Sequence, residues 1–321
     1  LGHTILYDTL INDVSTKDIA MIYHADMYLC PKALDNIEKY IKPKVIVSLT
    51  RIEPPLHPEG PEKILKDYGL EPEAMKEKDL LEFISTSNYK DKTTEGIFAP
   101  WAFYKKDFQT INGHDPLFAP QSKEDSDIFN RLQLNGVKFI QTWEGCVYHM
   151  TCRGSRRNTL DKAKNIFEDS PEWLAQNARS TRNFIRKWGH FVMHDEYMKP
   201  IIPSKYNIGF IVKNCDTNLL ANLEPWCDEI YIDCNPDVYM RSEQINTKYN
   251  LSKRIFKSSD KCNTDVTVEI DGNNFNLNYI KQLSQIIDDS GEIGEFELEN
   301  MLVNIKKIVK KEKTLIVCQK S

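Results

Sequence analysis

The sequence predicts an α/β protein with two sheet-containing domains. Short apolar segments of strand length, such as residues 19–23 and 45–49, alternate with segments of helical periodicity, such as residues 31–41. The alternation starts again at Tyr206, after a proline-containing stretch typical of a domain boundary. A chain of 321 residues is long enough to bury two cores. We therefore expect a mixed sheet flanked by helices, followed by a smaller second α/β domain.

Composition and charge exclude several classes of protein. Hydrophobic residues make up 40% of the chain and charged residues 28%, which is ordinary for a globular protein. The net charge of −5 disfavours a protein that coats nucleic acid, and no apolar run approaches the roughly 20 residues that span a bilayer. The eight cysteines show no CxxC spacing, which favours reduced thiols over a zinc site or a disulfide framework. We expect a cytoplasmic protein.

The elements of the first domain follow from periodicity and from turn residues. A helix over residues 2–14 precedes a βαβ unit made of the strands 19–24 and 45–49 and the helix between them. Prolines exclude regular structure from residues 54–61. Further on, we expect polar helices in 61–86 and a strand in 95–104. A helix is predicted from Ser122 to Leu134, with Ser122 as its N-cap. One long or two short strands in 137–148 and a helix in 159–188 complete the prediction.

The second domain repeats the strand–helix pattern. Strands are predicted at 208–212, 229–233, 254–256, 264–270 and 314–318, with helices at 219–226, 238–249 and 277–287. These patterns divide the chain into a first domain over 1–157, a helical connector over 158–204 and a C-terminal α/β domain over 205–321.

A histidine and an aspartate follow the first strand. Residues 19–23 run into His24-Ala25-Asp26, and side chains two apart on an extended backbone point the same way. Ligands of open α/β sheets bind just outside the carboxyl ends of the strands. Asp26 is therefore a candidate metal ligand, and a loop-capping role is the alternative.

Four segments together resemble the A-type nucleotide-sugar glycosyltransferases of the large inverting family 2, of a type seen in phages and large viruses. The resemblance covers roughly residues 1–157 and implies the GT-A fold, a Rossmann-like mixed sheet. The four segments are His24-Ala25-Asp26 in the place of the family's DxD motif, residues 96–104, residues 112–115 with 123–132, and residues 148–156.

The resemblance implies a metal site that holds the donor diphosphate. Asp26 would bind Mn²⁺ or Mg²⁺, with His149 as a second ligand and His24 in the place of a carboxylate near the donor. Arg153 and Arg156 would meet the diphosphate, because guanidinium groups bind phosphate oxygens in pairs. The alternatives are a strand-end histidine bonded to backbone and arginines in a solvated turn.

The resemblance also implies a general base and a sugar pocket. Asp125, with Glu124 beside it, would deprotonate the acceptor hydroxyl, and a carboxylate at a helix N-terminus is kept ionised by the helix dipole. The ordinary preference of acidic residues for helix N-termini is the alternative. Trp101, His114 and Asp115 would line the acceptor and sugar pocket, with core packing equally consistent for the tryptophan.

The family's opening βαβ unit, which grips the nucleotide base, has no counterpart before the first strand. The chain begins at Leu1 without a signal peptide, and we expect it to be processed, trimmed or incompletely represented. The alternatives are that another chain supplies the unit or that the protein is a degenerate relative. The absence of that unit predicts an exposed edge of a parallel sheet.

The second domain is similar to C-terminal domains appended to glycosyltransferases of viral and phage origin. Its acidic tips could form a second nucleotide site, and a degenerate module that packs on the first domain or mediates assembly is the preferred alternative. The tips are Asp216, Asp228, Asp233 and Asp237.

The expected function is a metal-dependent inverting transfer of a sugar from a nucleotide-sugar donor to a hydroxyl of a glycan or protein acceptor. If the protein is viral, its compartment would be the host cytoplasm. The alternative is a non-catalytic carbohydrate-binding or structural protein on a degenerate transferase fold. A nucleotidyltransferase would need a glycine-rich phosphate loop near the start, and the sequence has none.

Overall fold

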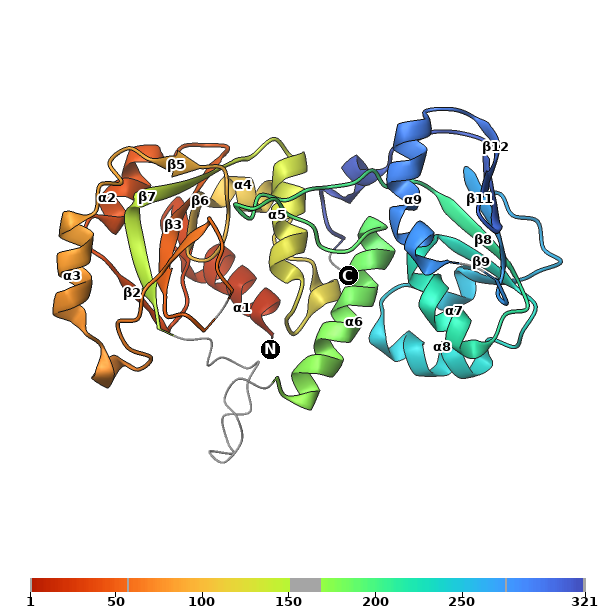
Figure 1. Cartoon of the computed structure of the whole chain (residues 1–321), viewed down its shortest axis with the longest axis horizontal. Coiled ribbons are helices and arrows are strands. Elements are labelled where there is room, and N and C mark those ends of the chain that lie inside the picture. The colour runs from red at the N-terminus through yellow and green to blue at the C-terminus, as the bar shows by residue number, and fades with distance from the viewer. Residues whose placement is uncertain (1, 57, 151–168, 275, 320–321) are drawn as a thin grey trace.

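The computed structural model describes residues 2–56, 58–150, 169–274 and 276–319, which fold into two mixed α/β modules (Figure 1). The first module comprises residues 2–150 and the second comprises residues 208–305. The prediction of two mixed sheets flanked by helices is confirmed. Among the described helices, none is long and apolar enough to cross a membrane.

The first sheet has the strand order β1-β6-β3-β7-β2, with β4 beside β3 and β5 beside β7. Its long central pair, β3 and β7, is parallel, whereas β6 runs antiparallel to both β1 and β3. The predicted βαβ strands are therefore separated by β6 and are not neighbours. The strands are β1 (Ile19–Ile22), β2 (Met27–Leu29), β3 (Val45–Glu53), β4 (Lys63–Leu65), β5 (Thr93–Thr94), β6 (Trp101–Tyr104) and β7 (Lys138–His149).

Helices cover the first sheet with apolar faces. In α2, Ala33 and Ile37 are buried four residues apart, as expected for one face of a helix. In α5, Ile128 and Leu132 repeat that spacing. The helices are α1 (His3–Thr9), which continues as a π-helical turn over Leu10–Val14, α2 (Ala33–Tyr40), α3 (Glu77–Thr86), α4 (Lys105–Thr110) and α5 (Glu124–Leu134). The predicted helices of 61–86 are partly wrong, since β4 occupies their first turn.

A bulge in β7 sets the register of the central strands. Leu49 stands opposite Thr142, but the next residue, Thr50, stands opposite Cys146, so β7 carries three extra residues. Gly145 lies in this bulge, where an added Cβ would come within 2.9 Å of Leu49 and of Asn36. The shifted register continues to the end of β3 and brings its last residue beside the last residue of β7.

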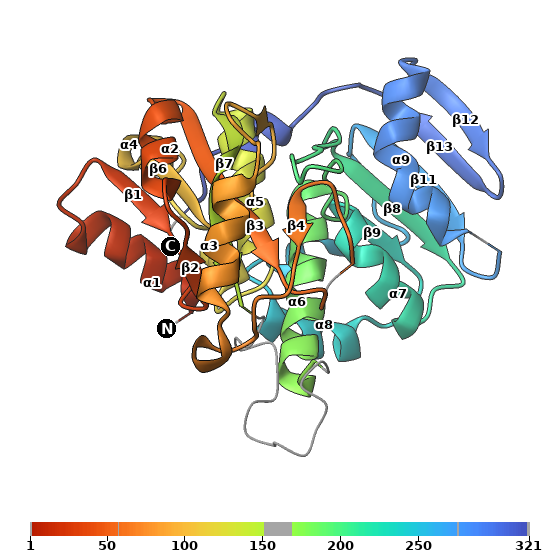
Figure 2. The same ribbon diagram turned by 60° about the vertical axis from the view of Figure 1, so that its left-hand side comes forward.

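One edge of the first sheet is open. Among the described residues, β1 pairs with β6 alone, so the other side of β1 carries no strand, and Figure 2 shows β1 at the outer edge. Ile19 on this strand is 39% exposed. The sequence predicted the exposed edge of a parallel sheet, whereas β1 runs antiparallel to β6.

The second sheet has the order β10-β9-β8-β11-β13-β12, and its first four strands are parallel. The sequence missed the antiparallel hairpin β12–β13, in which charged residues occupy the exposed positions. The elements are β8 (Ile208–Lys213), α7 (Thr217–Leu223), β9 (Glu229–Ile232), α8 (Asp237–Glu243), β10 (Ile255–Lys257), β11 (Val266–Asp271), α9 (Leu277–Ser290), β12 (Gly294–Leu298) and β13 (Met301–Ile305).

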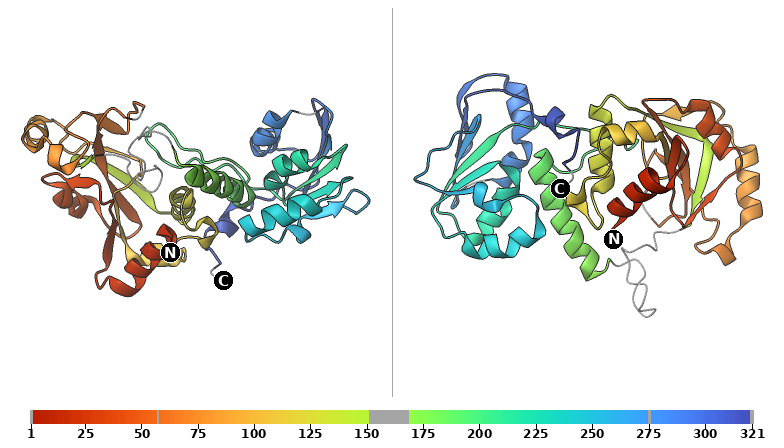
Figure 3. Two further views of the ribbon diagram at one scale, coloured as in Figure 1. Left: turned by 90° about the horizontal axis from the view of Figure 1, so that it is seen from below. Right: turned by 180° about the vertical axis from the view of Figure 1, so that it is seen from behind.

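Helix α6 (Pro171–Trp188) stands between the two sheets, as the views from below and from behind also show (Figure 3). Its last turn binds both modules with adjacent residues. Arg186 donates to Glu224 and Glu243 of the second module, at 2.7 Å each. Lys187 pairs with Asp127 of the first module at 2.6 Å.

The chain returns to the first module after the second sheet. Leu315 packs on the aromatic cluster that contains Trp188, and Ile316 packs on the core of the first module. The Asn112 side chain donates a hydrogen bond of 2.9 Å to the carbonyl of Cys318. We call residues 306–319 the tail. The predicted strand 314–318 is wrong, because residues 312–315 form a 3-10 turn.

Candidate functional site

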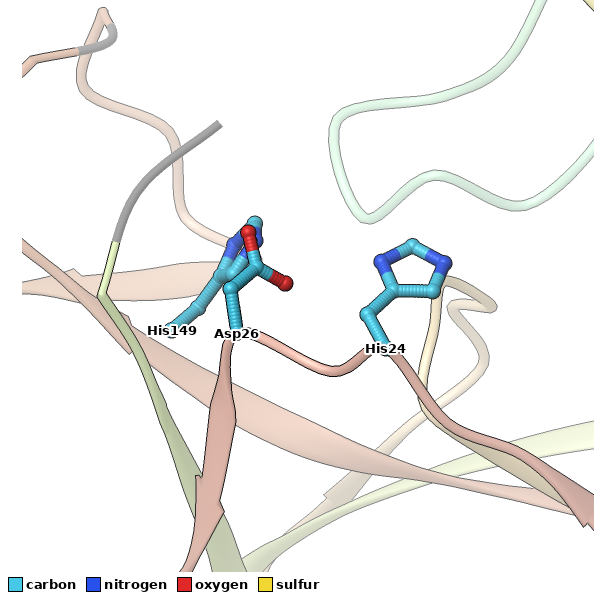
Figure 4. A group of neighbouring side chains, drawn as sticks. All are labelled: His24, Asp26 and His149. Atoms are coloured by element: carbon cyan, nitrogen blue, oxygen red, sulfur yellow. The ribbon is translucent and has the colours of Figure 1, made fainter. Parts of the chain in front are cut away.

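Three side chains with metal-binding atoms meet at one end of the first sheet (Figure 4). His24 and Asp26 lie between β1 and β2, and His149 is the last residue of β7. One ligand atom of each lies within 4.8 Å of the other two. The structure thus brings together Asp26 and His149, which the sequence assigned to one site, and adds His24.

Backbone hydrogen bonds hold these residues together. Met27 stands opposite His149 in the β2–β7 pair, and the Met150 N–H donates a 3.0 Å bond to the Asp26 carbonyl. The Met27 N–H donates to the His24 carbonyl at 3.2 Å, which closes a turn. His24 and Asp26 therefore belong to this turn, and the period-two argument from an extended strand was wrong for them.

His149 lies between two carboxylates. Its Nε2 is 3.4 Å from Asp26 Oδ2, and its Nδ1 is 2.9 Å from Glu53 Oε1. Burial by itself would lower the pKa of His149, but the hydrogen bonds and charges of both carboxylates outweigh it and raise the pKa to about 9. With no metal present, the His149 ring carries a positive charge at neutral pH.

The other two members of the cluster have shifted pKa values as well. Burial is the main cause that lowers the pKa of His24, which favours its neutral form. Burial would raise the pKa of Asp26, but the hydrogen bond and charge of His149 lower it. Neutral imidazole and ionised carboxylate are the protonation states that bind metal ions.

The sequence did not predict the network of buried ion pairs that holds Glu53, the second carboxylate beside His149. Glu53 is 2% exposed and lies 3.1 Å from Arg51 Nη1 and 3.3 Å from Lys63 Nζ. Both cations also face Glu62, at 3.4 and 3.8 Å. Burial opposes ionisation of Glu53, but His149, Arg51 and Lys63 together lower its pKa to about 2. Glu53 therefore stays ionised beside the ring.

The acidic pair predicted as the catalytic base begins α5. Glu124 is buried and Asp125 is partly buried, while the preceding residue, Lys123, has a left-handed backbone. Burial, followed by the charge of Glu124, raises the pKa of Asp125 to about 7. Ser122 is not the N-cap, because its hydroxyl bonds to Asn177 at 2.8 Å.

His3 links the two groups of residues. Its Nδ1 lies 3.9 Å from Glu124 Oε1, and its charge lowers the pKa of Asp125. The same side chain contributes to the lowered pKa of His24. The start of α5 and the histidine–aspartate cluster are thus electrostatically coupled through α1.

Trp101 is a core residue, and the prediction that it lines a sugar pocket is wrong. It is 1% exposed, with its ring 4.5 Å from that of Phe103 and 5.3 Å from that of Phe129. The strand that carries it is covered by α5, so the indole packs inward. The core-packing alternative was correct.

His114 and Asp115, which were predicted to line the acceptor and sugar pocket, make structural contacts. His114 is 1% exposed, and its Nδ1 lies 2.8 Å from Asp8 Oδ1. Asp115 accepts the Leu117 N–H at 2.9 Å as a helix cap and pairs with Lys187 at 2.7 Å. These contacts hold His114 against α1 and Asp115 against α6.

Two predicted donor-binding residues, Arg153 and Arg156, lie outside the described residues. The second aspartate of the acidic motif, Asp127, is fully buried and accepts hydrogen bonds from Arg131 at 2.7 Å and from Trp188 at 2.9 Å. Its contacts join α5 to α6, so it differs in role from Asp125.

The acidic tips of the second module hold its backbone. Asp216 caps α7 by accepting the Leu219 N–H at 2.7 Å. Asp233 accepts the N–H groups of Asn214 and Cys215, at 2.8 and 2.9 Å. These bonds give both side chains a structural role.

Comparison of the sequence with models of protein families gave no match, and a search of curated proteins also gave none. The fold and the site therefore define only a class: a mixed α/β protein with two imidazoles and one carboxylate at the strand ends of its first sheet.

Proposed function

We propose that the first module is a divalent-metal-dependent inverting glycosyltransferase, which moves a sugar from a nucleotide-sugar donor to a hydroxyl of a glycan or protein acceptor. One arrangement supports the proposal: His3 pairs with Glu124 at the acidic start of α5, and its charge also contributes to the lowered pKa of His24 in the cluster of His24, Asp26 and His149. A cation site and a basic carboxylate within one electrostatic environment are what such a transfer requires.

The three side chains suit a transition-metal ion. Two imidazole nitrogens and one carboxylate oxygen favour Mn²⁺ over Mg²⁺, because Mg²⁺ prefers oxygen ligands alone. His24, Asp26 and His149 would hold the ion, which supplies positive charge beside the departing diphosphate. The competing arrangement is a metal-free ion pair, in which protonated His149 bridges Asp26 and Glu53.

The chain's own base is Asp125. A carboxyl group whose pKa is about 7 is half ionised at neutral pH and is basic enough to take a proton from an acceptor hydroxyl. The charge of His3 favours the ionised form, although burial and the charge of Glu124 outweigh it. In this proposal Glu124 keeps the pKa of Asp125 high through its charge.

The test is release of nucleoside diphosphate from a panel of nucleotide sugars, with Mn²⁺, Mg²⁺ or no metal. We expect Mn²⁺-dependent turnover that Asp26→Asn abolishes by weakening metal binding. Asp125→Asn should lower kcat by about 100-fold or more while Mn²⁺ binding persists. Asp35→Asn, at an exposed position of α2, is the matched control and should leave both unchanged. Full activity of Asp125→Asn contradicts the assigned base, and calorimetry without binding at millimolar donor favours the non-catalytic alternative.

The donor set favours one further candidate. Two histidines and one carboxylate also hold iron(II) in non-haem oxygenases. Anaerobic loading with Fe²⁺ followed by measurement of dioxygen uptake separates this candidate from the transferase. Dioxygen uptake that depends on Asp26 and His149, without Mn²⁺-dependent release of diphosphate, would favour the oxygenase over the transferase.

A further inference from the structure

We infer that Glu53 is a positioning residue for the metal site: it orients the His149 ring so that Nε2 faces a divalent transition-metal ion held with His24 and Asp26. This inference rests on the proposed function, since it requires the cluster to bind a metal ion. It goes beyond that function because neither the sequence pattern nor the transfer chemistry assigns Glu53 a role.

The strand register places Glu53 beside His149. Ile52 stands opposite Tyr148 in the parallel β3–β7 pair, so the next residues along, Glu53 and His149, stand side by side. Had the register before the bulge continued, Cys146 would lie beside Glu53. The three extra residues of β7 therefore serve to bring the ring to the carboxylate.

The two nitrogens of the His149 ring have different partners. Nδ1 lies 2.9 Å from Glu53 Oε1, and Nε2 lies 3.4 Å from Asp26 Oδ2. A carboxylate that accepts the Nδ1–H selects the neutral tautomer whose Nε2 lone pair is available for a metal ion. Carboxylate partners of this kind also raise the basicity of a ligating imidazole.

Glu53 is fixed behind the ring. Its carboxylate is 2% exposed and is held by Arg51 at 3.1 Å and by Lys63 at 3.3 Å. The Arg51 guanidinium is itself stacked on the Phe98 ring at 3.8 Å. A carboxylate held from two sides orients His149 without reaching the cluster, and Glu53 is absent from the group of described residues whose ligand atoms converge.

The ion network supplies a matched control. Glu62 faces the same two cations as Glu53, at 3.4 Å from Arg51 and 3.8 Å from Lys63, and His149 bonds to Glu53. Loss of either negative charge removes a carboxylate from Arg51 and Lys63, but only loss of Glu53 removes the charge that orients the ring. Glu53→Gln and Glu62→Gln therefore separate positioning of His149 from stability of the network.

The experiment titrates the full chain with Mn²⁺ alone and measures free Mn²⁺ by electron paramagnetic resonance. We expect Glu53→Gln to weaken Mn²⁺ binding by about 10- to 100-fold, and Glu62→Gln to weaken it by about 2-fold or less. Circular dichroism checks that each variant is folded. If Glu53→Gln does not fold, Glu53→Asp keeps the charge but shortens its reach to Nδ1, and it should show the same loss.

A second readout reports the ring itself. In the Zn²⁺-loaded protein, ¹⁵N spectra of labelled histidine should show His149 with a protonated Nδ1 and a metal-bound Nε2, and Glu53→Gln should lose this uniform state. Equal Mn²⁺ affinity of the wild type and a folded Glu53→Gln overturns the inference and leaves the transferase proposal standing. Equal losses in Glu53→Gln and Glu62→Gln also overturn it. A wild type that binds neither Mn²⁺ nor Zn²⁺ overturns both proposals together.

Discussion

At the scale of single residues, Asp125 and Asp127 show how environment shifts the pKa values of two carboxyl groups of one helix turn in opposite directions. Asp127 is fully buried, but Lys187, Arg131 and Trp188 offset the cost of burial and lower its pKa. For Asp125, burial and the charge of Glu124 dominate, and the pKa rises to about 7. A carboxyl group in the second environment is poised to exchange a proton at neutral pH.

The raised pKa of Asp125 predicts a loss of stability with rising pH. The folded pKa of about 7 lies above the ordinary 3.8, so the folded state binds the proton more tightly. The resulting stabilisation is complete below about pH 4 and disappears as the pH rises through 7. In Asp125→Asn this contribution is absent. We expect the variant to gain stability relative to the wild type between pH 5 and 8 in urea denaturation, and a constant difference across that range contradicts the prediction.

The sequence predicted some site residues and missed others for identifiable reasons. Asp26 and His149 end or follow apolar strands, and the resemblance to the glycosyltransferases assigned them to one site. Glu53 was missed because the polar end of β3 looks like a loop, although its charges are buried in mutual ion pairs. Trp101 was ambiguous, since an aromatic strand residue serves a core and a sugar pocket equally well until its neighbours are known.

At the scale of elements, α6 is the buried connection between the modules. Arg186 is 1% exposed and donates to Glu224 and Glu243, while Arg254 also donates to Glu224 at 2.7 Å. On the same helix, Arg182 pairs with Glu243 at 2.7 Å but is 32% exposed. Helix α6 therefore makes one arginine–glutamate pair that is buried and another that is partly exposed to solvent.

Burial predicts different costs for removing these two arginines. Arg186→Met leaves buried carboxylates without one of their partners and should cost about 3–5 kcal/mol of unfolding free energy. Arg182→Met removes a more exposed pair and should cost about 1 kcal/mol or less. Chemical denaturation followed by circular dichroism measures both. Similar losses in the two variants contradict the prediction.

Elements with strong local periodicity were predicted well, and elements fixed by distant contacts were not. The strands β8, β9 and β11 and the helices α5 and α9 lie close to their predicted ranges, because each buries a regular apolar face. The β7 bulge and the β12–β13 hairpin depend on partners distant in sequence. The 314–318 segment has a strand-like apolar pattern, but Leu315 packs on the aromatic cluster that contains Trp188 and Ile316 packs on the core of the first module.

At the scale of the whole molecule, the second module is an insertion between α6 and the tail. Leu315 and Ile316 of the tail pack on residues of the first module and α6, whereas Val317 is 55% exposed. The double variant Leu315→Ala/Ile316→Ala should lose about 2 kcal/mol of unfolding free energy from apolar burial. Val317→Ala should lose about 0.5 kcal/mol or less. Denaturation monitored by tryptophan fluorescence measures both, and a double variant as stable as Val317→Ala contradicts the role given to the tail.

The returning tail also determines how the molecule carries mechanical load. Helix α1 and the tail both rest on the first module, where the His3 N–H donates to the Pro120 carbonyl and Ile316 packs on the core. A force applied between them acts first on the tail's contacts with the first module, while the second sheet lies outside the direct path of the load. In a pulling experiment the tail would detach first, and the second module would unfold only after that release had placed it in series with the force.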